Sequence, residues 1–453
     1  MAAESDGNVL SLGETADTPV GGPSPFGTLL LQYRRAAGMS QAQLAQASGM
    51  STRALRDLER GRARAAYRRS ADVLADALGL AGGNRELFLI AARVGRRRTP
   101  RGWDETASCS LPPGIVDRVG REPELEWLRT RVEAGRLVAV VGYPGVGKTA
   151  VAVAAAHRLA PVFPGGCLAV DLHGTDERPI AASEALGRLL SALGMSADRM
   201  PVAVAERSIL ARTLLHGRRM LVLLDDAATE DQVRPLLVAG RDCSTLITSR
   251  PTLAGLESVR RLWLRPLIET ESVCLLAHIV GAGRVDAEPE AAMTLARLCG
   301  GLPLALRIVG NRLATRPNWT IAAMVRRLGD HRSRLSTLRA GDLQALPTFD
   351  LSYRRLSVTA QMVFRRIALL PQVEFGDELA AVATNLSTGE VRAHLDELAY
   401  AGLLRADPAM QRIFQFNDLL KAFARQQLTE IEGQHVNKVL RDALLDRPRA
   451  SRD

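Results

Sequence analysis

At 453 residues the chain is long enough for about two to four domains. With 47% hydrophobic and 24% charged residues it has the composition of a soluble globular protein, and no apolar run reaches membrane-spanning length. The formal net charge of +10 favours an acidic partner, although such a charge also fits many other proteins. The five scattered cysteines lack metal-ligand spacing and the N-terminus is polar and acidic, which predicts a cytoplasmic protein with reduced thiols and no signal peptide.

The first regular elements expected along the chain are helices. Residues 1–24 are rich in Gly, Ser, Thr, Asp and Pro, which predicts a disordered tail, whereas residues 25–95 show a helical pattern without a strand signal. Ser40 is a good N-cap, Gly49 suits the left-handed residue that ends a helix, and Ser51 can cap the next helix. Two short helices joined by such a glycine turn predict a helix-turn-helix.

The second helix of this pair carries the side chains expected to read DNA. Thr52, Arg53 and Arg56 share its outward face, where arginine can pair with guanine edges and threonine with a base edge or methyl group. Seven arginines crowd this short segment, as phosphate binding requires: Arg53, Arg56, Arg60, Arg62, Arg64, Arg68 and Arg69. The alternative is a solvated charged face on a domain that recruits protein.

The stretch LLLQYRRAAGMSQAQLAQASGMSTRALRDLERG resembles the Xre/Cro-like helix-turn-helix family. This resemblance implies binding to double-stranded DNA, with Gln41 near the DNA backbone. It also implies that Arg34 pairs with Glu59 inside the domain, so we expect these two residues to be structural.

A basic, proline-rich linker over residues 96–112 leads to a second domain, expected over residues 113–265. There an apolar strand, residues 138–141, runs into GYPGVGKTA, which contains the phosphate-binding loop G-x-x-x-x-G-K-[ST]. Its glycines let backbone N–H groups point at phosphate oxygens, its lysine reaches the β- and γ-phosphates, and its threonine hydroxyl ligates Mg²⁺. The residues expected to hold the nucleotide are Gly142, Pro144, Gly145, Val146, Gly147, Lys148, Thr149 and Ala150.

Strand and helix patterns alternate after this loop, which predicts a parallel sheet covered by helices with ligands at the carboxyl ends of its strands. The buried strand LVLL ends in Asp225 and Asp226, as a Walker B element does. We expect Asp225 to hold Mg²⁺ directly or through water, and Asp226 to orient a water near the γ-phosphate. Arg250 follows the next strand and is expected to sense or stabilise γ-phosphate charge.

The remainder of the chain is predominantly helical. A helical domain is expected over residues 266–340, including a helix that begins at a Gly-Leu-Pro-Leu turn. Three further helices and a small hairpin predict a winged helix over residues 341–432. The polar residues 433–453 are predicted to be a frayed tail.

The motifs VGRE, GYPGVGKT, LVLLDD, TSR, GLPLAL and FND, in this order, resemble the NB-ARC type of signal-transducing ATPases. The resemblance runs from about Pro113 to Gln427 and implies a tightly held nucleotide, usually ADP. It places Val119 and Arg121 near adenine or ribose and Pro303 against adenine. The winged helix of this family usually contributes a histidine to the β-phosphate, and Asn417 stands at that position here.

Together these features predict a multidomain chain of α and α/β architecture, similar to actinobacterial transcriptional regulators. The expected function is sequence-specific DNA binding switched by ADP and ATP with Mg²⁺, with self-association in the active state and at most slow hydrolysis. One alternative is a signalling or defence ATPase whose N-terminal helices recruit a protein partner. Another is a housekeeping ATPase with steady turnover.

Overall fold

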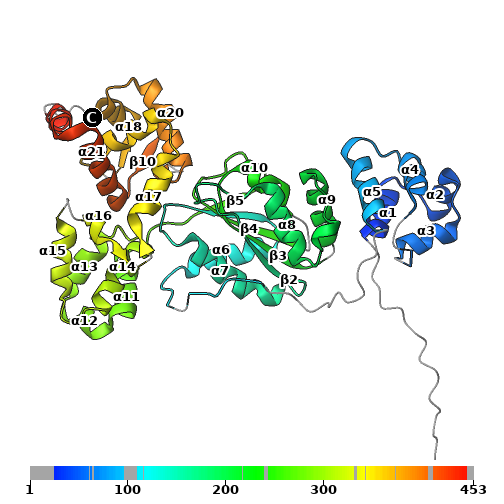
Figure 1. Cartoon of the computed structure of the whole chain (residues 1–453), viewed down its shortest axis with the longest axis horizontal. Helices are drawn as coiled ribbons and strands as arrows, with labels where there is room; N and C mark the ends of the chain where they lie inside the picture. Colours follow the sequence, from blue (N-terminus) through cyan, green and yellow to red (C-terminus); the bar gives the residue numbers. More distant parts are fainter. Residues whose placement is uncertain are drawn as a thin grey trace, which may run out of the picture. The chain divides into compact units, whose positions relative to one another are not determined.

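A computed structural model represents the whole chain. It describes residues 25–60, 62–63, 66–95, 110–115, 117–216, 218–238, 243–330, 334–341, 343–372, 374–406 and 412–445. The chain divides into two compact units, Met1–Gly102 and Trp103–Asp453, which are considered separately (Figure 1). The predicted N-terminal tail and most of the predicted linker lie outside the described residues.

The described part of the first unit is entirely helical, as the sequence predicts. Its helices are α1 (Pro25–Ala36), α2 (Gln41–Ser48), α3 (Thr52–Glu59), α4 (Arg68–Ala77) and α5 (Gly82–Gly95). Ser40 and Ser51 cap α2 and α3, because each hydroxyl accepts a hydrogen bond from a backbone N–H of its helix. Gly49 ends α2 at a φ of 63°, a left-handed conformation that glycine adopts without strain.

A core of apolar side chains holds these five described helices together. Its fully buried members include Phe26, Leu30, Leu44, Leu55, Leu74 and Phe88. Leu55 and Leu58 fix the inner face of α3, so the opposite face of that helix is left to solvent. The predicted helix-turn-helix is therefore formed by α2, the turn at Gly49 and α3.

The second unit contains a five-stranded parallel sheet with the order β2-β3-β4-β1-β5. The strands are β1 (Leu137–Val141), β2 (Gly166–Asp171), β3 (Met220–Ala227), β4 (Cys243–Ser249) and β5 (Arg260–Trp263). Helices α6 (Glu122–Glu133) and α7 (Lys148–Leu159) lie on one side of this sheet, and α8 (Ala182–Ala192), α9 (Val204–Leu215) and α10 (Glu230–Val233) complete the layers (Figure 1). The predicted α/β class is confirmed.

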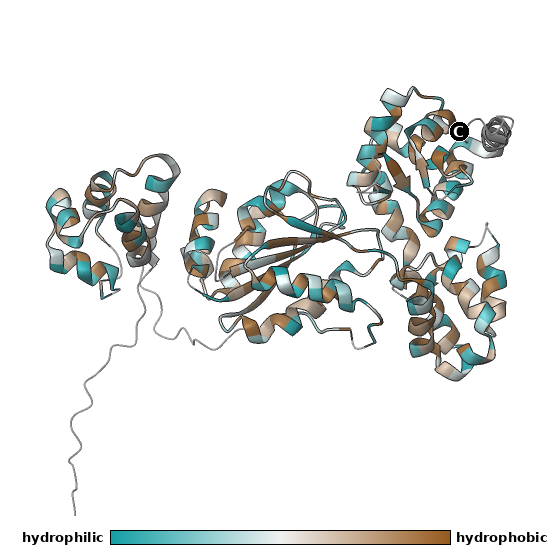
Figure 2. Cartoon of the chain, turned by 180° about the vertical axis from the view of Figure 1, so that it is seen from behind, coloured by the Kyte–Doolittle hydropathy of each residue, from teal (hydrophilic) through white to brown (hydrophobic). Residues whose placement is uncertain are grey.

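The inner strands are largely apolar and buried, as expected for a sheet covered by helices, whereas the edge strand β5 begins with two arginines (Figure 2). All five residues of β1 are buried, as are the first five of β3. The pairing of β3 with β4 is irregular between Leu224 and Ala227. This irregularity contains Asp225 and Asp226, so the two carboxylates leave the regular strand at its carboxyl end.

Helices α11 (Glu269–Val280), α12 (Ala282–Ala287), α13 (Pro289–Leu298), α14 (Pro303–Ala314), α15 (Ile321–Gly329) and α16 (Arg334–Thr337) follow the sheet. They share one apolar core with the sheet and with the C-terminal elements. A two-stranded ribbon, β6 (Arg339–Ala340) and β7 (Leu343–Gln344), leads to those elements.

The C-terminal elements, here called the wing segment, combine helices with a small antiparallel sheet of order β8-β10-β9. They are α17 (Ala345–Arg354), α18 (Val358–Ile367), β8 (Glu374–Gly376), α19 (Asp377–Thr384), α20 (Thr388–Tyr400), β9 (Arg405–Ala406), β10 (Ile413–Gln415) and α21 (Asp418–Leu445). The helix α21 is interrupted at Gly433, with a φ of 82°, and then continues where a frayed tail was predicted. No helix among the described residues is long and apolar enough to cross a membrane.

Candidate functional site

The phosphate-binding loop lies between the buried strand β1 and the helix α7. Gly142, Gly145 and Gly147 all have positive φ angles, which side chains other than glycine rarely adopt. A Cβ at Gly142 would lie 2.7 Å from the Leu264 carbonyl oxygen, so the close approach of β1 to this segment also requires glycine. No side chain caps the start of α7, which leaves its first N–H groups available to an anion.

Lys148 crosses this loop. Its ammonium group donates hydrogen bonds to the carbonyl oxygens of Gly142 (3.0 Å) and Tyr143 (3.1 Å). Burial, together with the nearby charge of Arg250, lowers the pKa of Lys148 to about 7, although the charges of Asp226 and Asp225 oppose this shift. A partly buried ammonium whose contacts are neutral carbonyl oxygens is stabilised by a nearby anion, so a polyphosphate fits this loop.

Two oxygen groups suited to a hard divalent cation lie beside the lysine. The Thr149 hydroxyl donates to a carboxylate oxygen of Asp225 at 2.9 Å, and the Thr248 hydroxyl donates to the same oxygen. Burial raises the pKa of Asp225, the two hydroxyl donors lower it, and Asp226 and Asp171 raise it again. Neighbouring negative charge of this kind favours a cation, and a hydroxyl with a carboxylate is the donor set that Mg²⁺ accepts next to phosphates.

Asp226 has an unusual backbone. Its φ is 52°, although it is not glycine, and its N–H donates to the Thr248 hydroxyl at 2.8 Å. One oxygen of its carboxylate accepts the N–H of Thr175 at 2.6 Å. Such a strained residue at a strand end is a reason to assign it a function.

Arg250 faces the same region, but its nitrogen Nη1 is engaged elsewhere. It donates to the Thr348 carbonyl oxygen at 2.6 Å and to the Ser352 hydroxyl at 2.9 Å, both on α17. Burial lowers the pKa of Arg250 to about 10. In this structure Arg250, the residue predicted to sense phosphate, therefore connects the end of β4 to α17 of the wing segment.

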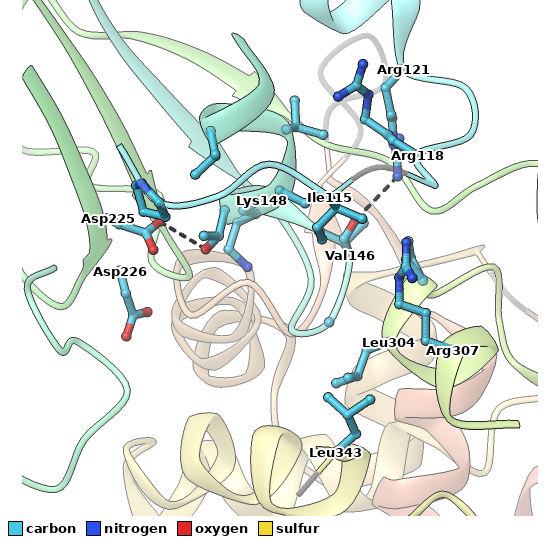
Figure 3. Close-up of a pocket in the computed structure, with 18 of the residues that line it drawn as sticks. Ile115, Arg118, Arg121, Val146, Lys148, Asp225, Asp226, Leu304, Arg307 and Leu343 are labelled. Atoms are coloured by element: carbon cyan, nitrogen blue, oxygen red, sulfur yellow. Dashed lines mark hydrogen bonds between the residues drawn. The ribbon is translucent and has the colours of Figure 1, made fainter. Parts of the chain in front are cut away.

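These side chains line one cavity of about 650 Å³ (Figure 3). The residues predicted from the sequence that line it are Val119, Arg121, Gly145, Val146, Gly147, Lys148, Thr149, Ala150, Asp225, Asp226, Arg250 and Pro303. Gly142 and Pro144 shape the loop without lining the cavity. Sequence reasoning missed other lining residues, which come from the segment before α6, the end of β2 and its following loop, the first half of α14, and β7: Pro112, Pro113, Ile115, Arg118, Asp171, His173, Thr175, Asp176, Leu304, Arg307 and Leu343.

Several arginines surround the end of the cavity away from the two aspartates (Figure 3). Arg121 is buried and donates to Glu124 at 3.1 Å and to the Val146 carbonyl at 3.4 Å, so it braces the loop. Arg307 forms a bidentate ion pair with Asp117, which lowers the pKa of that carboxyl. The Nε atom of Arg118 is buried without a hydrogen-bond partner among the described residues and lies in a residue that lines the cavity. Such an orphan donor fits a polar ligand.

The Gly-Leu-Pro-Leu turn contacts the phosphate-binding loop directly. The Leu304 N–H donates to the Gly145 carbonyl oxygen at 3.2 Å. Pro303 begins α14, and its ring lies 3.8 Å from a Cβ placed on Gly147. Pro303 therefore lies beside the phosphate-binding loop, and its contact with adenine stays a prediction.

Asn417 is placed away from this cavity. Its amide nitrogen donates to the Gly300 carbonyl at 2.8 Å, while its oxygen accepts the N–H groups of Leu419 and Leu420 at the start of α21. It lines a separate cavity of about 420 Å³ together with Tyr143. The sequence predicts a contact with the β-phosphate here, but the short asparagine instead satisfies a helix start, which a histidine would not do as readily.

The exposed face of α3 is the candidate nucleic-acid surface of the first unit. Thr52, Arg53 and Arg56 are all exposed, as predicted. Gln41 is only partly exposed, because its amide donates to Glu59 at 2.6 Å. Glu59 is also paired with Arg34, so the expected structural ion pair is present. Arg64 lies outside the described residues.

Comparison with known proteins identifies the first part of the chain and shows similarity to bacterial regulators over most of its length. Residues 25–88 match the family model described as a helix-turn-helix domain. The chain is 36% identical over 346 residues to the regulatory protein AfsR of Streptomyces coelicolor, an alignment that covers 73% of this chain and 35% of that protein. The chain thus contains a helix-turn-helix domain at residues 25–88 and is similar over most of its length to part of AfsR.

A second regulatory relative of this helix-turn-helix protein matches over a similar extent. AfsR of Streptomyces griseus is 36% identical over 320 residues, which cover 70% of this chain and 33% of that protein. The chain therefore spans about a third of the length of these relatives. Among solved structures, a Walker-type ATPase of Pyrococcus abyssi matches with 16% identity and a TM-score of 0.47, covering 70% of this chain and 98% of that one.

Proposed function

We propose that this chain is a DNA-binding transcriptional regulator whose NB-ARC-like module binds ADP or ATP with Mg²⁺ and acts as a switch. The observation that carries the proposal is the cavity at the phosphate-binding loop, with Lys148, Thr149 and Asp225 on its wall. It occurs in the same chain as a helix-turn-helix domain whose second helix exposes Arg53 and Arg56. The regulatory relatives in Streptomyces support the same reading.

Different residues of the cavity would bind different parts of the nucleotide. Backbone N–H groups at the start of α7 and the Lys148 ammonium would bind the phosphates. Thr149 and Asp225 would hold Mg²⁺, which supplies positive charge to the phosphate oxygens. Arg118 offers a buried donor, and Pro303 and Val119 offer apolar surface to the base.

The segment that enters from the helix-turn-helix domain forms part of the cavity wall. The Ser110 N–H donates to the Cys167 carbonyl at 2.9 Å, which attaches the segment to the edge strand β2. A ring nitrogen of His157, on α7, lies 2.8 Å from the Pro112 carbonyl oxygen. Pro112 and Ile115 line the cavity. This continuity supports coupling between the nucleotide and the DNA-binding domain.

The wing segment provides the other half of the proposed switch. The Tyr143 hydroxyl, on the phosphate-binding loop, donates to the Gln415 carbonyl at 3.0 Å. The Tyr400 hydroxyl donates to Glu230 at 2.8 Å. We infer that ADP keeps these contacts closed, and that exchange for ATP releases the wing segment and permits self-association. Several helix-turn-helix units in one oligomer would then bind repeated half-sites with higher avidity.

The test is a selection of bound sequences from random double-stranded DNA, performed with ADP-loaded and ATP-loaded protein. We expect enrichment of a repeated motif that depends on the nucleotide. Lys148→Ala is expected to lose bound nucleotide and this dependence while it retains weak DNA binding. Unchanged nucleotide content in Lys148→Ala would contradict the assignment of the loop.

The same measurements distinguish the alternative functions. DNA affinity that is weak on every sequence and indifferent to nucleotide, together with capture of a protein by the first unit, would favour a signalling ATPase. Fast multiple-turnover hydrolysis without DNA or a partner would favour a housekeeping ATPase. The exposed arginines on α3 favour the DNA-binding function over both.

A further inference from the structure

The strained residue Asp226 is held in place by the loop that follows β2. The Gly174 N–H donates to the Asp226 carbonyl oxygen at 2.7 Å, and the Thr175 N–H donates to the Asp226 carboxylate at 2.6 Å. A Cβ on Gly174 would lie only 2.2 Å from the same carbonyl oxygen, so the two segments are in direct backbone contact. Movement of this loop would therefore release the backbone and the carboxylate of Asp226 together.

The same loop is held from its other side by Arg355, which follows α17 in the wing segment. Its Nη1 donates to the Gly174 carbonyl oxygen, and its Nη2 donates to the Asp176 carbonyl oxygen at 2.8 Å. The two acceptors flank Thr175, whose N–H binds the Asp226 carboxylate. A planar guanidinium can bind both carbonyls at once, which a single ammonium cannot do as well.

A second arginine, which belongs to the sheet, donates hydrogen bonds to α17. Arg250, at the end of β4, donates to Thr348 and Ser352 of that helix. Arg250 and Arg355 are close enough for the charge of one to lower the pKa of the other. Two arginines thus attach α17 to the sheet near the Asp226 end of the cavity. Arg355 reaches from the wing segment to the loop after β2, and Arg250 reaches from the end of β4 to α17.

From this arrangement we infer that Arg355 is a positioning residue, which transmits the docking of α17 to Asp226 through residues 172–176. Arg355 does not line the cavity, so it acts on the loop and not on a ligand. The role of Asp226 toward the nucleotide rests on the proposed function. The mechanical link between α17 and Asp226 does not depend on it, and by thermodynamic reciprocity a change at either end affects the other.

Hydrogen exchange of the full-length protein without nucleotide tests this link. In Arg355→Ala the amides of Gly174 and Thr175 are expected to exchange about tenfold faster, because charge-assisted hydrogen bonds to their loop are lost. In Arg355→Lys the exchange rate of these amides is expected to lie between those of the wild type and Arg355→Ala, since the ammonium can reach one carbonyl at a time. Arg354→Ala is the matched control, because Arg354 is adjacent, its side chain is 76% exposed, and its ion pair within the described part of the chain is with Asp350.

The reverse direction and the ligand give two further readouts. Asp226→Ala is expected to speed amide exchange in α17. Mant-labelled ADP is expected to dissociate several-fold faster from Arg355→Ala than from the wild type, because Arg355 helps to hold the wing segment against the sheet. Unchanged exchange at Gly174 and Thr175 in Arg355→Ala, or an equal change in Arg354→Ala, would overturn the inference. Failure of the wild type to bind mant-ADP would contradict the proposed function and leave the exchange result valid.

Discussion

At the scale of single residues, the site depends on the environment of Lys148. Burial lowers its pKa to about 7, so the free protein holds a partly deprotonated amine near neutral pH. A bound phosphate carries negative charge within hydrogen-bonding distance and favours the ammonium form. Binding of a nucleotide is therefore expected to be accompanied by uptake of a proton.

This linkage makes nucleotide affinity depend on pH. Because the pKa of Lys148 is about 7 in the free protein and higher with phosphate bound, the affinity for Mg·ADP is expected to decrease as the pH rises above 7. The decrease would be at most about tenfold per pH unit. Titration calorimetry at pH 8 in two buffers of different ionisation enthalpy measures the proton uptake. Lys148→Arg, whose guanidinium stays charged in this pH range, should bind more weakly but without proton uptake or this pH dependence at protein concentrations that permit binding. Persistence of both in Lys148→Arg would contradict the assignment to Lys148.

At the scale of elements, the features that the sequence predicts correctly are those determined by residues close together in the chain. The phosphate-binding loop and the caps of α2 and α3 depend on residues a few positions apart, so their residue types are sufficient. The strand β5 was missed, because it has only four residues and is formed through its pairing with the distant β1. The contact of Asn417 with Gly300 also joins segments far apart in the chain, which no local pattern encodes.

The helix α3 carries a prediction of its own. Arg53→Ala and Arg56→Ala are each expected to weaken binding at the selected DNA site by about 1–3 kcal/mol if they read bases. Both side chains are exposed, so the thermal stability of the domain should not change. Arg85→Ala is a suitable control, since Arg85 lies on α5 and pairs with Asp76. Electrophoretic mobility shifts on cognate and scrambled DNA provide the measurement, and an equal loss on both would reduce these arginines to phosphate contacts.

At the scale of the second unit, the phosphate-binding loop is also a contact point for the wing segment. Tyr143 is buried, and burial raises its pKa, so its hydroxyl remains protonated and donates to Gln415 at all physiological pH values. Its ring packs edge-on against Trp263 with centroids 5.6 Å apart. The residue thus joins the loop that would hold phosphates to the small sheet of the wing segment. No local sequence pattern predicts this contact, because Tyr143 and Gln415 lie 272 residues apart in the chain.

Tyr143→Phe isolates this contact, because it removes the hydroxyl and retains the ring against Trp263. The variant leaves the Gln415 carbonyl without that donor, at an expected cost of about 0.5–1.5 kcal/mol to the closed arrangement. If the wing segment must open before nucleotide leaves, mant-ADP should dissociate several-fold faster, which stopped-flow fluorescence measures. Tyr33→Phe, which removes a hydroxyl contact with Asn84 in the first unit, is the control. Faster dissociation in Tyr143→Phe with unchanged DNA affinity would show that the wing contact does not control DNA binding. A parallel change in DNA affinity would show that the nucleotide couples the wing contact to the DNA-binding unit.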